Sequence, residues 1–119
     1  FNNSTLGMVK LEMLVNGLPD FQTDVPDTNY AEIARAIGFH AERVEDASRL
    51  EGAYREAFAA PGPALVEVIT DPNALSLPPA ITGGQVVGFA TAMSKIVLNR
   101  GIAEAFSMAT SNMRNIPRL

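Results

Sequence analysis

Four polar residues in a row near the start of the chain, Asn2-Asn3-Ser4-Thr5, supply neutral oxygen atoms. Side-chain amide oxygens and backbone carbonyl oxygens are suitable ligands for Mg²⁺, which prefers octahedral oxygen sites and commonly shares them with phosphates. The same residue types also favour a polar turn, and the hydroxyl of Ser4 or Thr5 can cap a following helix. Residue type alone leaves a magnesium site and a capped turn as open alternatives.

Met8 and Glu12 form a second candidate pair. Both fall in a predicted helix from about Gly7 to Val15, and their spacing of four residues places them on one helix face. A methionine at such a position usually packs in a core, and a helix glutamate is commonly solvated. Function and plain structure therefore both stay open for this pair.

Other groups that could do chemistry are few. The chain has no cysteine and a single histidine, His40, which excludes thiolate sites and multi-histidine zinc sites. We expect His40 to be a surface or hydrogen-bonded residue, because nothing pairs it with a nucleophile. Asp20, Asp24 and Asp27 do not have calcium-loop spacing, so we expect solvated loop charges.

The elements that must position these residues alternate between strands and helices. Phe1–Asn3 is predicted to be the end of a buried strand, and the β-branched run Ala64–Thr70 is the clearest strand. Between them we predict a helix capped by Asp27 or Thr28 and ending at Gly38, a strand at Phe39–Val44, and a helix starting at Asp46 or Ser48. Their predicted buried stripes are Ala31, Ile33, Ala34 and Ile37, then Leu50, Ala53, Tyr54, Ala57 and Phe58.

This order of elements predicts an α/β fold with a parallel sheet and right-handed crossovers. Ligands of such sheets bind beyond the carboxyl ends of the strands, which favours Asn2–Gly7 as the site. Composition agrees with a packed domain, since 47% of the 119 residues are hydrophobic and 18% are charged. Because the chain starts at Phe1 without an initiator Met, we expect a piece of a longer protein.

Charge divides the chain into two regions. Residues 1–71 carry 5 basic and 12 acidic residues, and residues 72–119 carry 4 basic and 1 acidic, which gives −7 and +3 and sums to the net charge of −4. We therefore predict an α/β body over 1–71 and a linker with a helical tail over 72–119. The net negative charge disfavours nucleic acid as a partner, and no apolar run approaches the about 20 residues that span a bilayer.

The tail is predicted to contain two amphipathic helices, at Gln85–Leu98 and Ile102–Met113, separated by a break at residues 99–101. Basic amphipathic helices can bind a membrane surface, and the alternative is packing against the rest of the protein. The predicted stripes are Val86, Phe89, Ala90, Met93, Ile96 and Val97, then Ile102, Ala105, Phe106, Ala109 and Met113, with Lys95, Arg100, Arg114 and Arg118 as the basic residues.

The opening F-N-N-S-T-L-G-M-V-K-L-E-M resembles the end of the thiamin diphosphate motif of decarboxylating enzymes, which starts with Gly-Asp-Gly and ends in Asn-Asn. The resemblance is greatest to the pyruvate oxidase group, in particular the quinone-reducing pyruvate dehydrogenases. Further segments agree: D-T-N-Y-A-E-I-A-R-A-I-G, R-V-E-D-A-S-R-L, G-P-A-L-V-E-V, and L-S-L-P-P before the tail. The Gly-Asp-Gly half of the motif is absent from this chain.

The resemblance implies roles for the segment Asn3-Ser4-Thr5-Leu6-Gly7 in binding thiamin diphosphate. Asn3 would give its side-chain oxygen to Mg²⁺, and Thr5 would give its backbone carbonyl. Gly7 would let the backbone pass close to the diphosphate, and amides at a helix N-terminus favour an anion. Asn2 matches a more variable position of the motif.

The resemblance also implies an activity. Met8 would pack near the reacting end of the cofactor, and Glu12 would place water or stabilise charge there. The parent enzyme would decarboxylate pyruvate or a related 2-keto acid to acetate and CO₂, pass electrons through FAD to quinone, and form a dimer or tetramer. It would be cytoplasmic or peripheral on the inner face of the membrane, with contact through 85–119, and the isolated piece would be inactive.

Two alternatives stay open. A carboligase resembling acetolactate synthase shares much of the pattern, although such enzymes typically carry Gln-Trp where this chain has Leu11-Glu12. A non-enzymatic α/β interaction module with a basic tail is the second alternative.

Overall fold

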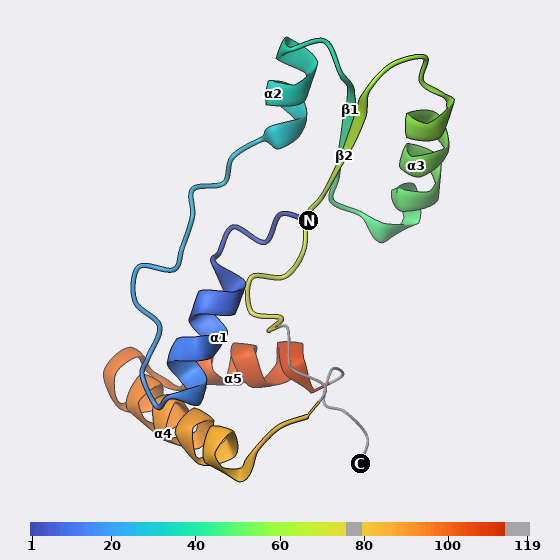
Figure 1. Cartoon of the computed structure of the whole chain (residues 1–119). Coiled ribbons are helices and arrows are strands. Elements are labelled where there is room, and N and C mark those ends of the chain that lie inside the picture. The colour runs from blue at the N-terminus through green and yellow to red at the C-terminus, as the bar shows by residue number, and fades with distance from the viewer. Residues whose placement is uncertain (76–79, 114–119) are drawn as a thin grey trace. The chain divides into compact units, whose positions relative to one another are not determined.

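The computed structural model describes residues 1–75 and 80–113, which form two compact units. Unit 1 comprises residues 1–4 and 26–70, and unit 2 comprises residues 5–25 with the described residues from 71 onward. Unit 1 holds the strands with helices α2 and α3, and unit 2 holds helices α1, α4 and α5 (Figure 1). Helices and parallel strands together confirm the predicted α/β class.

Unit 1 is built on two parallel strands, β1 (His40–Val44) and β2 (Ala64–Val68). Their register places His40 opposite Ala64 and Val44 opposite Val68. The connection between them runs through the 3₁₀ turn η1 (Ala47–Arg49) and α3 (Leu50–Ala59), and α2 (Tyr30–Ala36) precedes β1. Figure 1 shows α2 and α3 on opposite sides of the strand pair.

The start of the chain adds one residue to this sheet. The Asn2 amide donates to the Val68 carbonyl at 2.8 Å, and the Thr70 amide donates to the Asn2 carbonyl at 2.9 Å. The intervening Ile69 amide donates to Val44, so Asn2 lies on the edge of β2 away from β1. The predicted buried strand end is therefore right for Asn2 and wrong for Phe1, which is 94% exposed.

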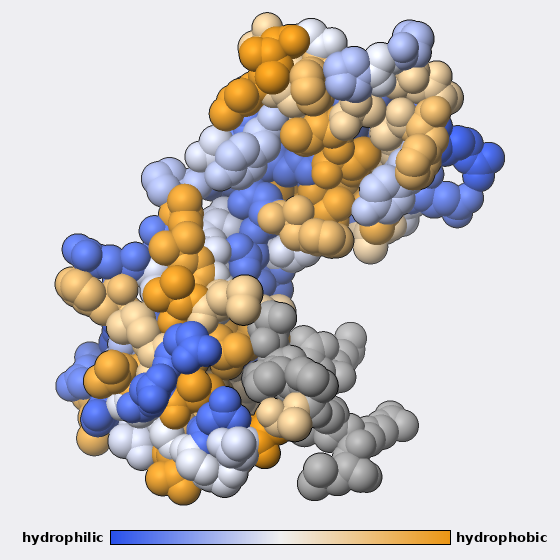
Figure 2. All heavy atoms as spheres, viewed as in Figure 1, coloured by the Kyte–Doolittle hydropathy of each residue, from blue (hydrophilic) through white to orange (hydrophobic). Residues whose placement is uncertain are grey.

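Small residues form one buried cluster of unit 1, namely Ala31, Ala34 and Ala41 with Phe39 and Leu65 against them. Val44 and Ala53 of unit 1 are also buried. A sheet of two strands is too narrow to cover a broad helix face, so the short side chains nearest to it are buried and the larger ones are not. The prediction that Ile33, Ile37 and Phe58 are buried is wrong, since they are 52%, 68% and 89% exposed. Figure 2 shows hydrophobic surface over α2.

Three helices make the core of unit 2: α1 (Gly7–Val15), α4 (Gly83–Arg100) and α5 (Ile102–Asn112). The predicted boundaries of all three are right to within two residues. A capping box between Thr82 and Gln85 begins α4, and Gly101 with φ +96° separates α4 from α5. The buried cluster consists of Leu11, Leu14, Leu75, Ala92, Ile96 and Met108.

The predicted stripes of α4 and α5 are partly wrong. Ile96 is buried as predicted, but Val86, Phe106 and Met113 are 57%, 71% and 70% exposed. On α5 the buried positions are Met108 and Asn112. Both helices are apolar on more than one side, so packing against neighbours selects the buried face.

α4 comes very close to the end of α1 at Gly88. A Cβ atom at that position would lie 1.8 Å from the Val15 carbonyl oxygen, which no real Cβ atom tolerates. The absence of a side chain at Gly88 is thus what permits this approach of the two helices.

Candidate functional site

The strand end of unit 1 is organised by the side chain of Asn2. Its amide nitrogen donates to the Glu67 carboxylate at 2.7 Å and to the Thr28 carbonyl at 3.1 Å, and its amide oxygen accepts from the Ser4 amide at 3.1 Å. Asn2 is 8% exposed. These three hydrogen bonds engage the Asn2 side chain within unit 1.

Ser4 has a left-handed backbone conformation, with φ +49°. A non-glycine residue pays roughly 1 kcal/mol for this conformation, and the bond from its amide to Asn2 helps to hold it. Strained non-glycine residues often mark functional turns. The turn that contains Asn3 therefore has a specific backbone conformation, which the hydrogen bond between Ser4 and Asn2 stabilises. Ser4 does not cap α1.

In unit 2, Thr5 and Leu6 are fixed to the loop that follows α1. The Thr5 hydroxyl and the Leu6 amide both donate to the Thr23 carbonyl, at 3.1 and 2.7 Å. Leu6 is the N-cap of α1, with no side-chain capping bond, so the prediction that Ser4 or Thr5 caps this helix is wrong. The Thr5 hydroxyl serves the loop instead.

The first turn of α1 contains no acidic residue. An uncapped helix start carries partial positive charge and backbone N–H donors, which suit a phosphate group. The Asn3 amide oxygen in unit 1 and the start of α1 at Gly7 in unit 2 are each groups of the type that a magnesium diphosphate needs. Within the described residues, no group of three or more His, Asp or Glu side chains could hold a metal.

Met8 and Glu12 both lie on the exposed part of α1. Met8 is 74% exposed and Glu12 is exposed, whereas Leu11 and Leu14 point into the core of unit 2. The alternative that Met8 packs in a core is therefore wrong for this chain. The proposed roles of Met8 and Glu12 toward a cofactor stay predictions.

Asp20 differs from the solvated loop charge that the sequence predicted. It is 6% exposed, accepts from Arg100 at 3.0 Å, and lies 3.8 Å from the ammonium group of Lys10. Lys10 is 5% exposed. The sequence did not predict its ion pair, because no acidic residue lies three or four positions away in the same helix. Asp27 is on the surface, paired with Arg43 at 2.9 Å, and His40 is exposed.

Two basic residues of the predicted tail also bind within unit 2. Lys95 donates to the Gly17 carbonyl at 2.9 Å, and Arg100 binds the Asp20 carboxylate and carbonyl. No helix in the described parts of the chain has both the length and the apolar character needed to cross a membrane. Arg114 and Arg118 lie outside the described residues.

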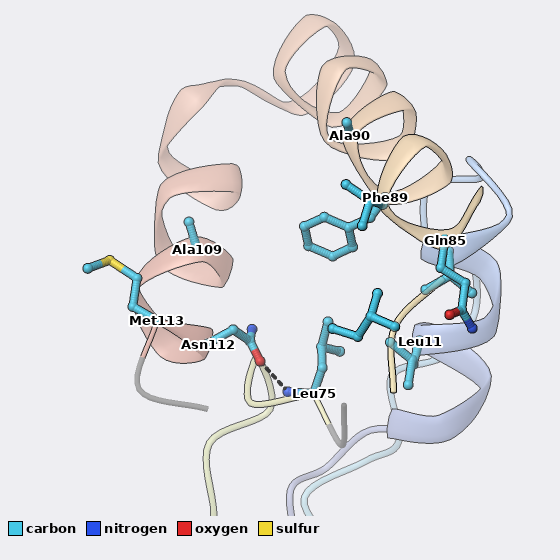
Figure 3. Close-up of a pocket in the computed structure, with 11 residues that line it drawn as sticks. Leu11, Leu75, Gln85, Phe89, Ala90, Ala109, Asn112 and Met113 are labelled. Carbon is cyan, nitrogen blue, oxygen red and sulfur yellow. Dashed lines mark hydrogen bonds between the residues drawn. The ribbon is translucent and has the colours of Figure 1, made fainter. Parts of the chain in front are cut away.

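An apolar pocket of about 400 Å³ lies between α1, α4 and α5. Leu11, Leu75 and Phe89 line it, and Figure 3 shows them converging from α1, the residue-75 loop and α4. Asn112 is committed to Leu75, Asn73 and Met108, and Gln85 takes part in the capping box. These walls do not suit a charged diphosphate, so this pocket is not the predicted cofactor site.

Comparison with known proteins decides the family. Residues 1–68 match the family model described as "Thiamine pyrophosphate enzyme, C-terminal TPP binding domain". The chain belongs to the thiamine pyrophosphate enzyme family. Thiamine pyrophosphate is the thiamin diphosphate of the sequence resemblance, so the resemblance to this class of enzyme is confirmed.

Curated relatives of this thiamine pyrophosphate enzyme segment are much longer. It is 36% identical over 94 residues to "Putative thiamine pyrophosphate-containing protein YdaP" of Bacillus subtilis, covering 79% of this chain and 16% of the relative. It is 46% identical over 48 residues to "Probable acetolactate synthase" of Mycobacterium bovis and to "Acetolactate synthase large subunit IlvG" of Mycobacterium tuberculosis, covering 40% of this chain and 9% of each.

Proposed function

We propose that this chain is the C-terminal cofactor-binding part of a Mg²⁺- and thiamin diphosphate-dependent enzyme that oxidatively decarboxylates a 2-keto acid. The observation that carries the proposal is the uncapped, acid-free start of α1 in a segment that matches the family model. Asn3 would bind Mg²⁺ through its amide oxygen and Thr5 through its backbone carbonyl. Residues Ser4, Leu6 and Gly7 would shape the backbone around the diphosphate.

When bound, thiamin diphosphate supplies the carbon nucleophile and the electron sink for loss of CO₂. The contribution of this chain is to bind and orient the cofactor. Glu12, exposed on α1, would stabilise charge or place water beside the substrate, and Met8 would pack against it. With pyruvate, water and a quinone, the products are acetate, CO₂ and quinol, with FAD bound elsewhere in a dimeric or tetrameric parent enzyme.

A carboligase of the acetolactate synthase type is the second candidate. It is favoured by the 46% identity to the mycobacterial proteins, over 48 residues. Against it stands Leu11-Glu12, where the resembling carboligases carry Gln-Trp, and the match covers 40% of this chain. The exposed Glu12 gives α1 a carboxylate that such a carboligase would lack.

The tail has two proposed roles. Burial of Ile96 and Met108 supports packing with α1 as the role of α4 and α5. Membrane-surface contact through residues 85–119 of a cytoplasmic enzyme remains the alternative, and exposed Val87, Leu98 and Phe106 would be its apolar contacts. Sedimentation of the parent enzyme with anionic vesicles separates these roles. Membrane contact predicts sedimentation with the vesicles that weakens in about 0.5 M salt, which screens surface charge.

The decisive experiment compares two products in the parent enzyme. Pyruvate, Mg²⁺ and thiamin diphosphate are supplied with and without a dye that accepts electrons, and acetate and acetolactate are measured. Dye reduction that matches acetate formation supports the oxidoreductase. Acetolactate formation at the same rate with and without the dye would favour the carboligase. If pyruvate and longer 2-keto acids give neither the decarboxylated acid nor the carboligation product, both candidate functions are overturned.

A further inference from the structure

A carboxylate is buried in β2, the more apolar of the two strands in the described residues. Glu67 lies in β2, within the sequence Ala-Leu-Val-Glu-Val, and is 4% exposed. A buried charge is costly unless donors surround it. One oxygen accepts from the Asn2 side chain at 2.7 Å, and the other accepts from the Ala31 amide at 3.0 Å. Arg43 lies 3.5 Å from the first oxygen.

The two oxygens of Glu67 serve two different segments. The bond to Ala31 satisfies the start of α2, as an N-terminal cap would. The bond to Asn2 instead fixes the orientation of an amide whose oxygen accepts from the Ser4 amide. Ser4, which has a left-handed backbone conformation, belongs to the turn that carries Asn3. The bond between Glu67 and Asn2 therefore acts on this turn through the Asn2 side chain.

We propose that Glu67 is a positioning residue for the cofactor-binding turn: through Asn2 it sets the backbone at Asn3 and Ser4 that presents the metal ligand. This inference rests on the proposed function, because it takes Asn3 as the Mg²⁺ ligand. A carboxylate is required, since both partners are donors and a glutamine offers one acceptor and one amide group. Burial raises the pKa of Glu67. The hydrogen bonds from Asn2 and from the Ala31 and Tyr30 amides, together with the charge of Arg43, outweigh burial and lower the pKa overall, so the acceptor form persists.

The test uses the parent enzyme stripped of cofactor and titrated calorimetrically with thiamin diphosphate at several Mg²⁺ concentrations. Glu67→Gln is expected to raise the Mg²⁺ concentration for half-saturation about tenfold, the effect of one lost charge-assisted bond of about 1.4 kcal/mol. Glu42→Gln is the matched control, because within the described residues the Glu42 side chain, on β1 of the same unit, pairs only with Arg49. It is expected to leave the titration unchanged.

Rescue distinguishes positioning from plain stability. In the double variant Asn2→Asp with Glu67→Gln, the glutamine can donate to the new carboxylate while its oxygen still accepts from Ala31. The bond from residue 2 to the Thr28 carbonyl is lost, so the recovery is partial. We expect at least a threefold recovery of the Mg²⁺ half-saturation over Glu67→Gln alone. If Glu67→Gln lowers the melting temperature but leaves the titration unchanged, or if the double variant shows no recovery, the inference is overturned.

Asn3→Ala separates this inference from the proposed function. A titration that Asn3→Ala leaves unchanged contradicts the ligand role of Asn3, and with it the basis of the inference. A titration weakened by Asn3→Ala and unaffected by Glu67→Gln contradicts the positioning role alone.

Discussion

Asp20 pairs with Lys10 and so holds the loop that follows α1 to that helix. Their side chains are 8% and 6% exposed, and Arg100 from α4 binds the same carboxylate. Neutralising Asp20 would remove the charge of the carboxylate that forms an ion pair with the buried Lys10 ammonium. We expect Asp20→Asn to lower the free energy of unfolding by about 3 kcal/mol, measured by urea denaturation followed by circular dichroism.

The control for Asp20→Asn is Glu51→Gln. Glu51 and Arg55 form a pair whose side chains are 84% and 77% exposed, and such pairs contribute at most about 0.5 kcal/mol. An equal effect of the two variants would mean that the buried pair does not stabilise the loop.

Asp71 gives unit 2 a dependence on acid. Hydrogen bonds from Ser111 and from the Asn73 amide lower the pKa of Asp71 below its ordinary value, and Lys10 adds to this. An acid with a lowered pKa in the folded state stabilises it above the ordinary pKa, and this stabilisation is lost as pH falls through the folded pKa.

We therefore expect Asp71→Asn to lower the melting temperature at pH 6 and to lose that difference as the pH falls below the ordinary aspartate pKa of about 4. The test is to record melting curves of the unchanged protein and of Asp71→Asn between about pH 2.5 and 7, a range that includes the ordinary aspartate pKa. A difference that stays constant across the range would show that protonation of Asp71 is not responsible.

At the residue scale, the sequence could indicate the ligand types but not their supports. Asn3, Thr5 and Gly7 stand together in one short segment, so local pattern and family resemblance suffice to propose them. Glu67 and Lys10 act through partners 65 and 63 residues away. The one available signal was a charge within an apolar strand, which predicts a buried partner without saying which.

Gly88 sets the distance between two helices. Alanine usually stabilises a helix interior relative to glycine by about 1 kcal/mol, but its Cβ would meet the Val15 carbonyl at 1.8 Å. We expect Gly88→Ala to lower the free energy of unfolding by about 2 kcal/mol, as overpacking does.

Gly84→Ala is the matched variant, since among the described residues no atom beyond its chain neighbours and its own helix backbone lies within 4 Å of a Cβ there. It is expected to be neutral or slightly stabilising in the same urea experiment. If Gly88→Ala is as stable as Gly84→Ala, the close approach of α4 and α1 is not maintained in solution.

At the element scale, helix ends were easier to predict than helix faces. Gly17, Gly38 and Gly101 all have positive φ and end or separate helices as their residue type suggests. Caps were less certain: Asn29 caps α2 in place of the predicted Asp27 or Thr28, because its side chain reaches the Glu32 amide. The buried faces depended on neighbours distant in sequence, which periodicity does not identify.

The parent enzyme should be needed for activity. The chain covers 16% of its Bacillus relative, and the resemblance assigns the Gly-Asp-Gly half and the flavin site to other parts. We expect the isolated 119-residue chain to show no dye reduction with pyruvate and to bind thiamin diphosphate more weakly than the parent. Turnover by the isolated chain at the parent's rate would contradict the proposed division of the site.

The order of residues in unit 2 also has a consequence during synthesis. α1 ends at Val15, and its partner α4 begins at Gly83, roughly 70 residues later. At about 5 to 20 residues per second, a ribosome needs about 3 to 14 s to make that stretch. For that time Leu11 and Leu14 have emerged, or are about to emerge, without the helix that buries them. The nascent chain thus offers an apolar segment to chaperones before its own tail can cover it.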